Sequence, residues 1–297
     1  MSARVRRLVV TAVLLVSGLT AATAWQWPVP APAIARTFGQ DAGGYLLRGV
    51  ELAGGAQPVF PVEAGIVVAA HRERSDVPSG LGSFVVVEHE QAFRSVYAHL
   101  DAELLPRVGQ PVDVDTQIGT VGESGLVEGR ALRLSIIDLE SGWYVNPMLL
   151  LPDLPDSVRP AVDAVYARNA SALYDLDRTS TLPPGTYEIT VAVRDRVSAD
   201  RTGATVAPYS ISMFVAGQET FSTVMDRIAV RPDATTVEPG GATAEVLYGV
   251  EGLIRLGTLT VGAGQTEVEI VALDFAGNET SWDHDITGSS TPNEDVQ

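Results

Sequence analysis

The chain contains no cysteine among its 297 residues. This absence excludes disulfide bonds and thiolate metal sites, and it excludes lipid attachment through an N-terminal cysteine. Stability must therefore come from a buried apolar core. Histidine is scarce as well, since the sequence has only His71, His89, His99 and His284. A metal site built on imidazole would have few candidate ligands.

Basic residues are few compared with acidic ones, and the formal net charge is -17. Removal of Arg4, Arg6 and Arg7 with an N-terminal signal would lower the charge to -20. A chain this acidic is repelled by nucleic acid and by anionic lipid surfaces. We expect no nucleic-acid partner, and we expect membrane contact only transiently, during export.

The N-terminus has the three parts of a secretory signal. Arginines precede an uncharged run from Leu8 to Thr20, and small residues follow as far as Ala24. The apolar run is about 13 residues long, whereas a helix needs about 20 to cross a bilayer. We predict a signal peptide over residues 1–24 that is cleaved after Ala24, with an uncleaved membrane tether as the alternative. The expected location is the periplasm or the extracellular cell envelope.

Short β-branched runs recur along the chain and are separated by turn residues. They include Gly65–Ala70, Phe84–His89, Ser95–Leu100 and Leu132–Ile137. The later runs Gly185–Asp195 and Thr266–Asp274 alternate strictly between apolar and polar residues, which is typical of a sheet with one buried face. No long stretch has a helical period. The sequence predicts an all-β protein.

A proline- and aspartate-rich break at Leu151–Asp156 divides the strand series. We predict a first domain over residues 25–152, a linker over 153–161, an immunoglobulin-like β-sandwich over 162–287 and a disordered polar tail over 288–297. The segment Asp274–Glu279 resembles the last hairpin of bacterial immunoglobulin-like modules.

A series of motifs follows in one order from Trp27 to Pro147. They are Trp27-Pro28-Val29, Arg48–Ala53, Pro58–Val67, Tyr97-Ala98-His99-Leu100, Val108–Val112, Gln117–Gly122, Gly125–Ile136 and Val145-Asn146-Pro147. In order and spacing this segment resembles the lysostaphin-type zinc endopeptidases, which cut peptidoglycan cross-bridges. The resemblance implies an antiparallel, barrel-like β-sheet for the first domain.

The resemblance also implies which positions would bind zinc. In the family, a histidine, an aspartate four positions later and the second histidine of a His-x-His motif bind the metal; these positions hold Leu47, Glu51 and Arg133 here. The two assisting histidines correspond to His99 and Ala131. Leucine cannot coordinate and arginine repels a divalent cation. We therefore expect no zinc, no other cofactor and no hydrolysis by the family mechanism.

The substitutions predict an ion pair in place of the metal. In the family fold the aspartate and the last histidine meet at zinc, so Glu51 and Arg133 should face each other, with the guanidinium supplying the positive charge. A carboxylate and a guanidinium can pair through two hydrogen bonds. Such a pair would avoid leaving either charge buried alone.

The remaining candidates have simpler explanations beside the chemical ones. His99 is a vestige of catalysis or a packed and hydrogen-bonded residue, and the second explanation is favoured. His89 and His99 together would lack a third metal ligand. Trp143 and Tyr144 are either stacking platforms or core residues. We expect Glu51, His99, Arg133, Trp143 and Tyr144 to line one cleft.

These features favour a non-catalytic cell-envelope protein whose peptidase-like domain binds peptidoglycan or regulates a cell-wall hydrolase. Relatives of the family that lack zinc ligands activate amidases, so the resemblance implies a hydrolase partner. One alternative is an active zinc endopeptidase that uses atypical ligands. Another is a structural or adhesive surface protein.

Overall fold

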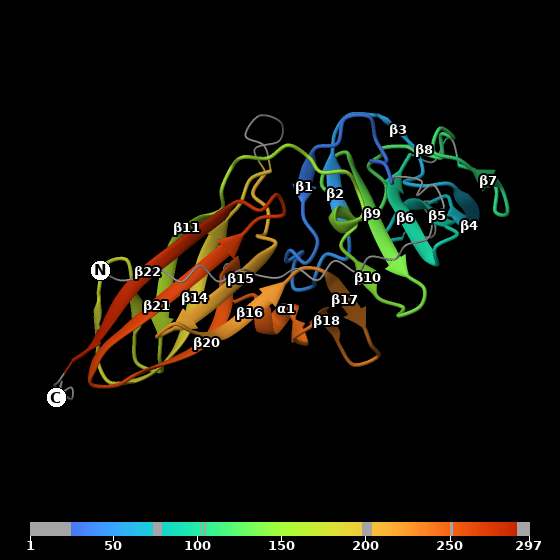
Figure 1. Cartoon of the computed structure of the whole chain (residues 1–297). Helices are drawn as coiled ribbons and strands as arrows, with labels where there is room; N and C mark the ends of the chain where they lie inside the picture. Colours follow the sequence, from blue (N-terminus) through green and yellow to red (C-terminus); the bar gives the residue numbers. More distant parts are fainter. Residues whose placement is uncertain are drawn as a thin grey trace, which may run out of the picture.

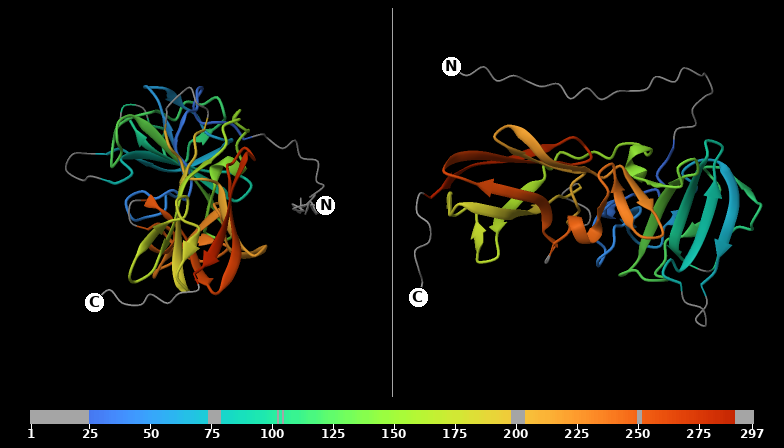
Figure 2. Two further views of the ribbon diagram at one scale, coloured as in Figure 1. Left: turned by 90° about the vertical axis from the view of Figure 1, so that its left-hand side faces the viewer. Right: turned by 90° about the horizontal axis from the view of Figure 1, so that it is seen from below.

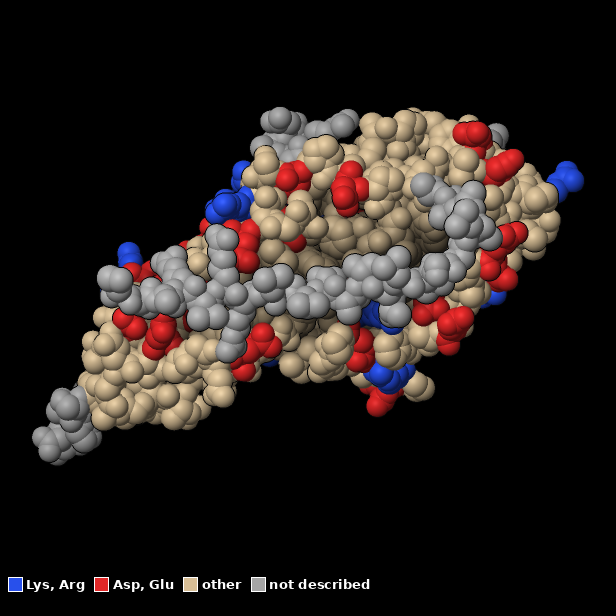
Figure 3. All heavy atoms as spheres, in the orientation of Figure 1, with Lys and Arg blue, Asp and Glu red and all other residues tan. Residues whose placement is uncertain are grey.

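A computed structural model describes residues 25–73, 79–101, 103, 105–197, 204–249 and 252–289. The predicted signal peptide and residues 290–297 of the predicted tail lie outside the described residues. The fold is all-β, as the sequence predicts, and the molecule is elongated with two lobes (Figure 1). In the described ranges, no helix is long and apolar enough to span a membrane. On the face drawn in Figure 3, acidic side chains are spread over both lobes, in keeping with the net charge of -17.

The first lobe is built on one large antiparallel sheet. Its own strands are β1 (Ile34–Arg36), β2 (Val50–Ala53), β4 (Gly65–His71), β5 (Ser83–Glu88), β6 (Phe93–Leu100), β7 (Pro111–Val112), β9 (Ala131–Asp138) and β10 (Tyr144–Val145). They run in the order β10-β9-β6-β5-β4-β7, and β2 joins β9 to β1. Strands β3 (Pro58–Val59) and β8 (Gly119–Thr120) pair with each other and form a separate two-stranded antiparallel sheet. A 3-10 turn, η1 (Pro147–Leu149), follows β10.

Alternation along the central strands places one face of this sheet in a core. In β5, Ser83, Val85 and Val87 are buried while their neighbours are partly exposed. Tyr97 on β6 is fully buried, and its hydroxyl accepts a hydrogen bond from the backbone N–H of Val62 (2.7 Å). This buried face fixes the register of the strands, because a slip by one residue would expose every core side chain.

The second lobe is a sandwich of two sheets. One contains β12 (Leu173–Asp175), β11 (Ala161–Arg168), β14 (Gly185–Arg194) and β20 (Ile254–Val261), in that order. The other contains β13 (Thr181–Leu182), β22 (Glu279–Gly288), β21 (Gly264–Leu273), β15 (Ser210–Val215) and β16 (Gln218–Val224). The parallel pairing of β13 with β22 and the order of the antiparallel strands give an immunoglobulin-like topology.

One segment of the second half leaves the sandwich and completes the sheet of the first lobe. The strands β17 (Arg227–Val230), β18 (Thr235–Glu238) and β19 (Ala242–Thr243) follow β16, and α1 (Ala244–Leu247) leads back to β20. Strand β17 pairs with β10, so that the sheet continues as β19-β18-β17-β10 (Figures 1 and 2). In an immunoglobulin sandwich this stretch of chain supplies strand D. Sequence analysis missed this exchange, and the predicted domain boundaries stay a prediction.

The first lobe also contributes residues to the core of the second lobe. Phe38 and Leu46, which precede the first-lobe strand β2, are buried in the core of the second lobe. Tyr248 donates a hydrogen bond to the backbone oxygen of Gly39 (3.0 Å), and Asn146 Nδ2 donates one to that of Met225 (2.8 Å). The two lobes therefore share strands, core residues and hydrogen bonds.

Candidate functional site

A row of direct cross-strand neighbours crosses the first lobe where the resemblance places the metal. Arg36 on β1 is opposite Glu51 on β2, Glu51 is opposite Arg133 on β9, and Arg133 is opposite Ala98 on β6. Directly opposed residues share one face of a sheet and lie within side-chain reach of each other. The register alone therefore brings two guanidinium groups to one carboxylate.

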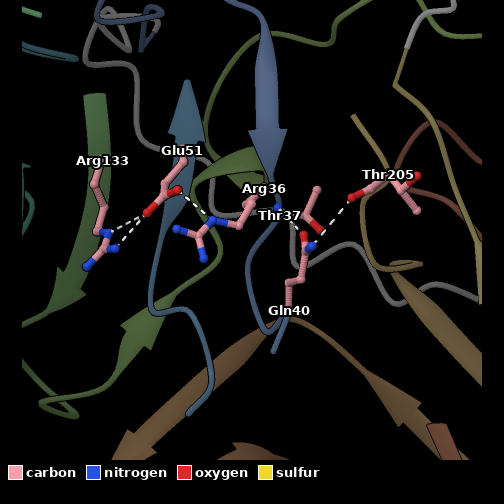
Figure 4. Close-up of polar contacts among 6 residues, drawn as sticks. All are labelled: Arg36, Thr37, Gln40, Glu51, Arg133 and Thr205. Atoms are coloured by element: carbon pink, nitrogen blue, oxygen red, sulfur yellow. Dashed lines mark hydrogen bonds and ion pairs between the residues drawn. The ribbon is translucent and has the colours of Figure 1, made fainter. Parts of the chain in front are cut away.

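The Glu51 carboxylate is shared between these two arginines (Figure 4). Arg133 donates to Oε1 from Nε (3.0 Å) and from Nη2 (2.6 Å). Arg36 donates from Nε to the other oxygen, Oε2 (2.6 Å). The Glu51 side chain is 4% exposed, against 12% for Arg133 and 31% for Arg36. The structure thus brings Glu51 and Arg133 together, but both Arg133 bonds converge on one oxygen because Arg36 occupies the other.

The remaining positions that the resemblance assigns to zinc chemistry carry apolar side chains. Leu47 is 1% exposed and Ala131 is 5% exposed. Within the described residues, no group of three or more His, Cys, Asp or Glu side chains is arranged to hold a metal ion. The residues that are present at these positions do not fit a catalytic zinc ion, which takes three protein ligands with lone pairs.

His99 lies at the end of β6 and is fully buried. Its backbone has a φ of 65°, in the left-handed region that favours glycine. Its Nδ1 is 2.9 Å from the carbonyl oxygen of Ser124, so Nδ1 carries the proton and donates it. Nε2 is buried and has no hydrogen-bond partner in the described part of the chain. Burial lowers the pKa of His99, and the nearby Arg133 lowers it further, which favours the neutral imidazole.

An open cavity of about 650 Å³ lies beside this row. Glu51, Arg36 and Ala131 contribute to its wall, together with Tyr45 and the segment Gly125–Glu128. Arg130 also lines it, and this arginine pairs with Asp101 (2.9 Å) and Glu123 (3.2 Å). The cavity therefore presents guanidinium groups that are already engaged by carboxylates.

The structure does not bring the two predicted aromatic residues to this cavity. Trp143 lies in a separate cavity with Asp226, Arg227 and Glu238, and Arg231 lies 5.9 Å from the centre of its ring. Tyr144 is on β10, between β9 and β17, and packs against the core of the second lobe. The expectation of one cleft for all five residues is wrong, because only Glu51 of the five lines this cavity and β17 joins the sheet next to the aromatics.

His89 and His99 lie at opposite ends of β6. The backbone N–H of His89 donates to the carbonyl oxygen of Phe93, at the start of that strand. The backbone N–H of His99, near its end, donates to the carbonyl oxygen of Leu81. The His89 ring is held by the carbonyl oxygen of Ala64 (3.0 Å) and by Ser95 Oγ (2.7 Å). The two histidines cannot share a metal ion, and His89 belongs to a buried hydrogen-bond network.

Sequence reasoning missed Arg36. Its position in a three-residue strand gives no periodic signal, since β1 is too short to show alternation. A search for a basic residue in a strand that flanks Glu51 could have found it, because a buried carboxylate needs a positively charged partner.

Comparison with known families gives two matches. The profile described as Peptidase family M23 matches residues 46–147. A second profile matches residues 159–287. The first match covers the strands that carry Glu51, His99 and Arg133, and the second covers the sandwich together with the segment that it lends to the first lobe.

Two curated proteins illustrate the similarity. The murein hydrolase activator NlpD of Escherichia coli (strain K12) is 31% identical over 134 residues, which are 45% of this chain and 32% of NlpD. A lipoprotein NlpD/LppB homolog of Pseudomonas aeruginosa is 32% identical over 129 residues, 43% of this chain and 40% of that protein. The chain thus matches between about a third and two fifths of the length of these relatives.

Solved structures show similarity over a comparable share of the chain. A catalytic domain of the prophage-encoded M23 protein EnpA from Enterococcus faecalis is 21% identical, with a TM-score of 0.36, over 42% of this chain and 95% of that domain. The catalytic domain of lysostaphin from Staphylococcus simulans is 20% identical, with a TM-score of 0.35, over 40% of this chain and 90% of that domain.

Proposed function

Since residues 46–147 form a domain of peptidase family M23, we propose that the chain is a non-catalytic cell-envelope protein that regulates a peptidoglycan hydrolase. The observation that carries the proposal is the Glu51 carboxylate, which two arginine side chains engage at both oxygens. A carboxylate in this state has no lone pair directed at a metal, and a divalent cation would be repelled by both guanidinium groups. Such a site does not supply a zinc-activated water.

The names of the curated relatives support a regulatory role. The E. coli relative is a murein hydrolase activator, and its match covers 134 residues of this chain. A protein can bind a hydrolase or peptidoglycan with a domain that does no chemistry, because recognition needs only a surface. The proposed partner of this chain is accordingly a cell-wall hydrolase or peptidoglycan itself.

Export is part of the proposal. The relatives include proteins named as lipoproteins and as an outer-membrane antigen, which are names of cell-envelope proteins. This chain has no cysteine for lipid attachment. We propose that the segment of residues 1–24 directs export and is then removed.

Zinc content of the purified full-length protein tests the loss of catalysis. After incubation with excess zinc and removal of free metal, we expect far less than one zinc per chain. The matched variant combines Leu47→His, Glu51→Asp, Ala131→His and Arg133→His, which restores the family pattern and should bind about one zinc ion. Stoichiometric zinc in the native protein would overturn the proposal and identify an enzyme with atypical ligands.

A second assay addresses regulation directly. Purified murein hydrolases release dye from labelled peptidoglycan, and the rate is measured with and without the full-length protein. A changed rate for one hydrolase, with no release by the protein alone, is the expected result. No change for any hydrolase, together with no co-sedimentation with peptidoglycan, would instead favour a structural role.

A further inference from the structure

A second cavity lies where the two lobes meet, away from the Glu51 site. Its volume is about 290 Å³, and both lobes contribute to its wall. The first lobe provides Trp27 and Phe38, and the second provides Tyr209 and Phe275. The Tyr209 and Phe275 rings meet edge to face, with centroids 4.9 Å apart. An aromatic wall of this kind suits an apolar or cationic guest.

One carboxylate on this wall has no positively charged partner among the residues that the structure describes. Asp195 lines the cavity and is only 3% exposed. Its Oδ1 accepts a hydrogen bond from the backbone N–H of Arg196 (2.7 Å), and no described residue forms a hydrogen bond or ion pair with Oδ2. Its backbone forms a bridge with Val206, which fixes the side chain at the wall. A buried carboxylate without a cation is costly unless something supplies one.

The residues around Asp195 make its ionised form still more costly. Two other acids, Asp274 and Asp156, act on it electrostatically, and no cation is among the charges that do. Burial, together with these acids, raises the pKa of Asp195 from its ordinary value of 3.8 to about 7. Asp274 differs in that its two oxygens accept the backbone N–H and the side-chain amide of Asn278 (2.8 and 2.7 Å). Asp195 is the carboxylate that a positively charged ligand would satisfy.

Further aspartates on the wall add negative charge near Asp195. Asp153 lines the cavity together with Asp156. Tyr209 does not offer its hydroxyl to a guest, because it donates to Asp226 (2.6 Å). The wall therefore combines aromatic faces with negative charge, and its volume is at the lower end of the range for ligand pockets. A guest must be small, with an apolar body and a single cationic group.

We propose that this cavity binds a primary ammonium group carried on a short apolar stem. The ammonium donates to Oδ2 of Asp195, and the stem lies against Trp27, Tyr209 and Phe275. Such a group occurs in free alkylamines and in amino-alkyl side chains of peptides. The inference does not depend on the proposed regulation of a hydrolase.

Isothermal titration of the full-length protein at pH 8 tests the site with three probes. They are n-butylammonium, its uncharged counterpart n-butanol, and Nα-acetyl-lysine N-methylamide. We expect n-butylammonium to bind at least tenfold more tightly than n-butanol. Binding of both amines would indicate that the site accepts a side chain of a peptide, and binding of n-butylammonium alone would indicate a free amine.

The variant Asp195→Asn keeps the shape and removes the charge. We expect it to weaken binding of n-butylammonium at least tenfold, whereas Glu219→Gln, an exposed carboxylate on β16, should leave binding unchanged. In the native protein, affinity should also fall between pH 8 and pH 5 as Asp195 takes up a proton, and this fall should be absent in Asp195→Asn. Equal binding by Asp195→Asn, equal binding of n-butanol, or no binding of any probe would overturn the proposal.

Discussion

Glu51 and Asp195 are two carboxylates with the same exposure and opposite surroundings. Each is 3% exposed. Glu51 lies inside the sheet of the first lobe, where the strands on both sides of it supply an arginine. Asp195 lies at the junction of the lobes, where the charges of described residues that act on it are those of Asp274 and Asp156. Burial alone therefore does not decide which partners a carboxylate has; the residues packed around it do.

The comparison separates a closed site from an open one. At Glu51 both oxygens have charged donors, so nothing further is needed for stability. At Asp195 one oxygen has only a backbone donor, and a cavity adjoins it. The Glu51 carboxylate is therefore fully paired within the described residues, whereas Asp195 has an oxygen that a positively charged group could still reach. Four substitutions test this contrast.

The largest effect is expected for Arg133→Met. This change leaves the buried Glu51 carboxylate with Arg36 alone, and removing one partner of a buried ion pair costs about 3–5 kcal/mol. We expect a loss near the lower limit, about 3 kcal/mol, because Arg36 remains. Urea unfolding followed by far-ultraviolet circular dichroism measures the free energy of unfolding.

The double variant Glu51→Gln with Arg133→Met is the control for that prediction. It removes the buried negative charge together with its partner, so it should lose less stability than Arg133→Met alone. An equal or larger loss would show that Arg133 stabilises the sheet through packing of its side chain and not through the charge of Glu51.

A smaller loss is expected for Arg36→Met. Arg36 supplies the charged hydrogen bond to Oε2, and bonds to charged groups contribute about 1.5–3 kcal/mol. Since the Arg36 side chain is 31% exposed, water can replace part of this bond, and we expect about 1.5–2 kcal/mol in the same unfolding assay. A loss equal to that of Arg133→Met would mean that exposure does not distinguish the two arginines.

Asp195→Asn should change stability in the opposite direction. The pKa of Asp195 is raised to about 7 in the folded state, so the native protein holds the proton more tightly than the unfolded chain does. The contribution of Asp195 to stability is therefore complete below the ordinary pKa of 3.8 and is lost progressively as pH rises from there through about 7. At pH 8 the variant should be more stable by about 1 kcal/mol, after allowance for solvent screening in the cavity.

Thermal unfolding at pH 5 and pH 8 measures this difference. The melting temperature of the variant should exceed that of the native protein by more at pH 8 than at pH 5, because the loss of stability at Asp195 is complete only above about pH 7. A lower melting temperature for the variant at pH 8 would show that the ionised carboxylate of Asp195 is stabilised in the folded protein, and the contrast with Glu51 would fail.

The fold of the first lobe was predictable because its strands carry local patterns. Alternating burial in β5 and the Tyr97-Ala98-His99-Leu100 motif on β6 both follow directly from the residue order. The second lobe was predictable as a sandwich for the same reason, since β14 and β21 alternate. The exchange of β17 and β18 was not, because pairing with β10 depends on contacts between residues about 80 positions apart.

The candidate site shows the same limit. The pairing of Glu51 with Arg133 follows from the positions that the family motifs assign to these two residues. The contribution of Arg36 and the separation of Trp143 do not, because they depend on β1 and β10, which are too short to show a periodic pattern. The environment of Asp195 depends on the packing of two lobes, for which the sequence of either lobe carries no local pattern.

The smallest effect is expected for Arg94→Met, and it isolates burial. Arg94 and Glu88 are direct cross-strand partners, as Arg133 and Glu51 are. Arg94 binds Glu88 Oε2 at 2.6 Å through Nη2, yet the two side chains are 43% and 40% exposed. Exposed pairs contribute about 0–1 kcal/mol and are screened by salt, so we expect a loss of about 0.5 kcal/mol that disappears in 1 M salt. If Arg94→Met and Arg133→Met cost the same in urea unfolding, the pairing geometry and not the burial of Glu51 would set the stability of both pairs.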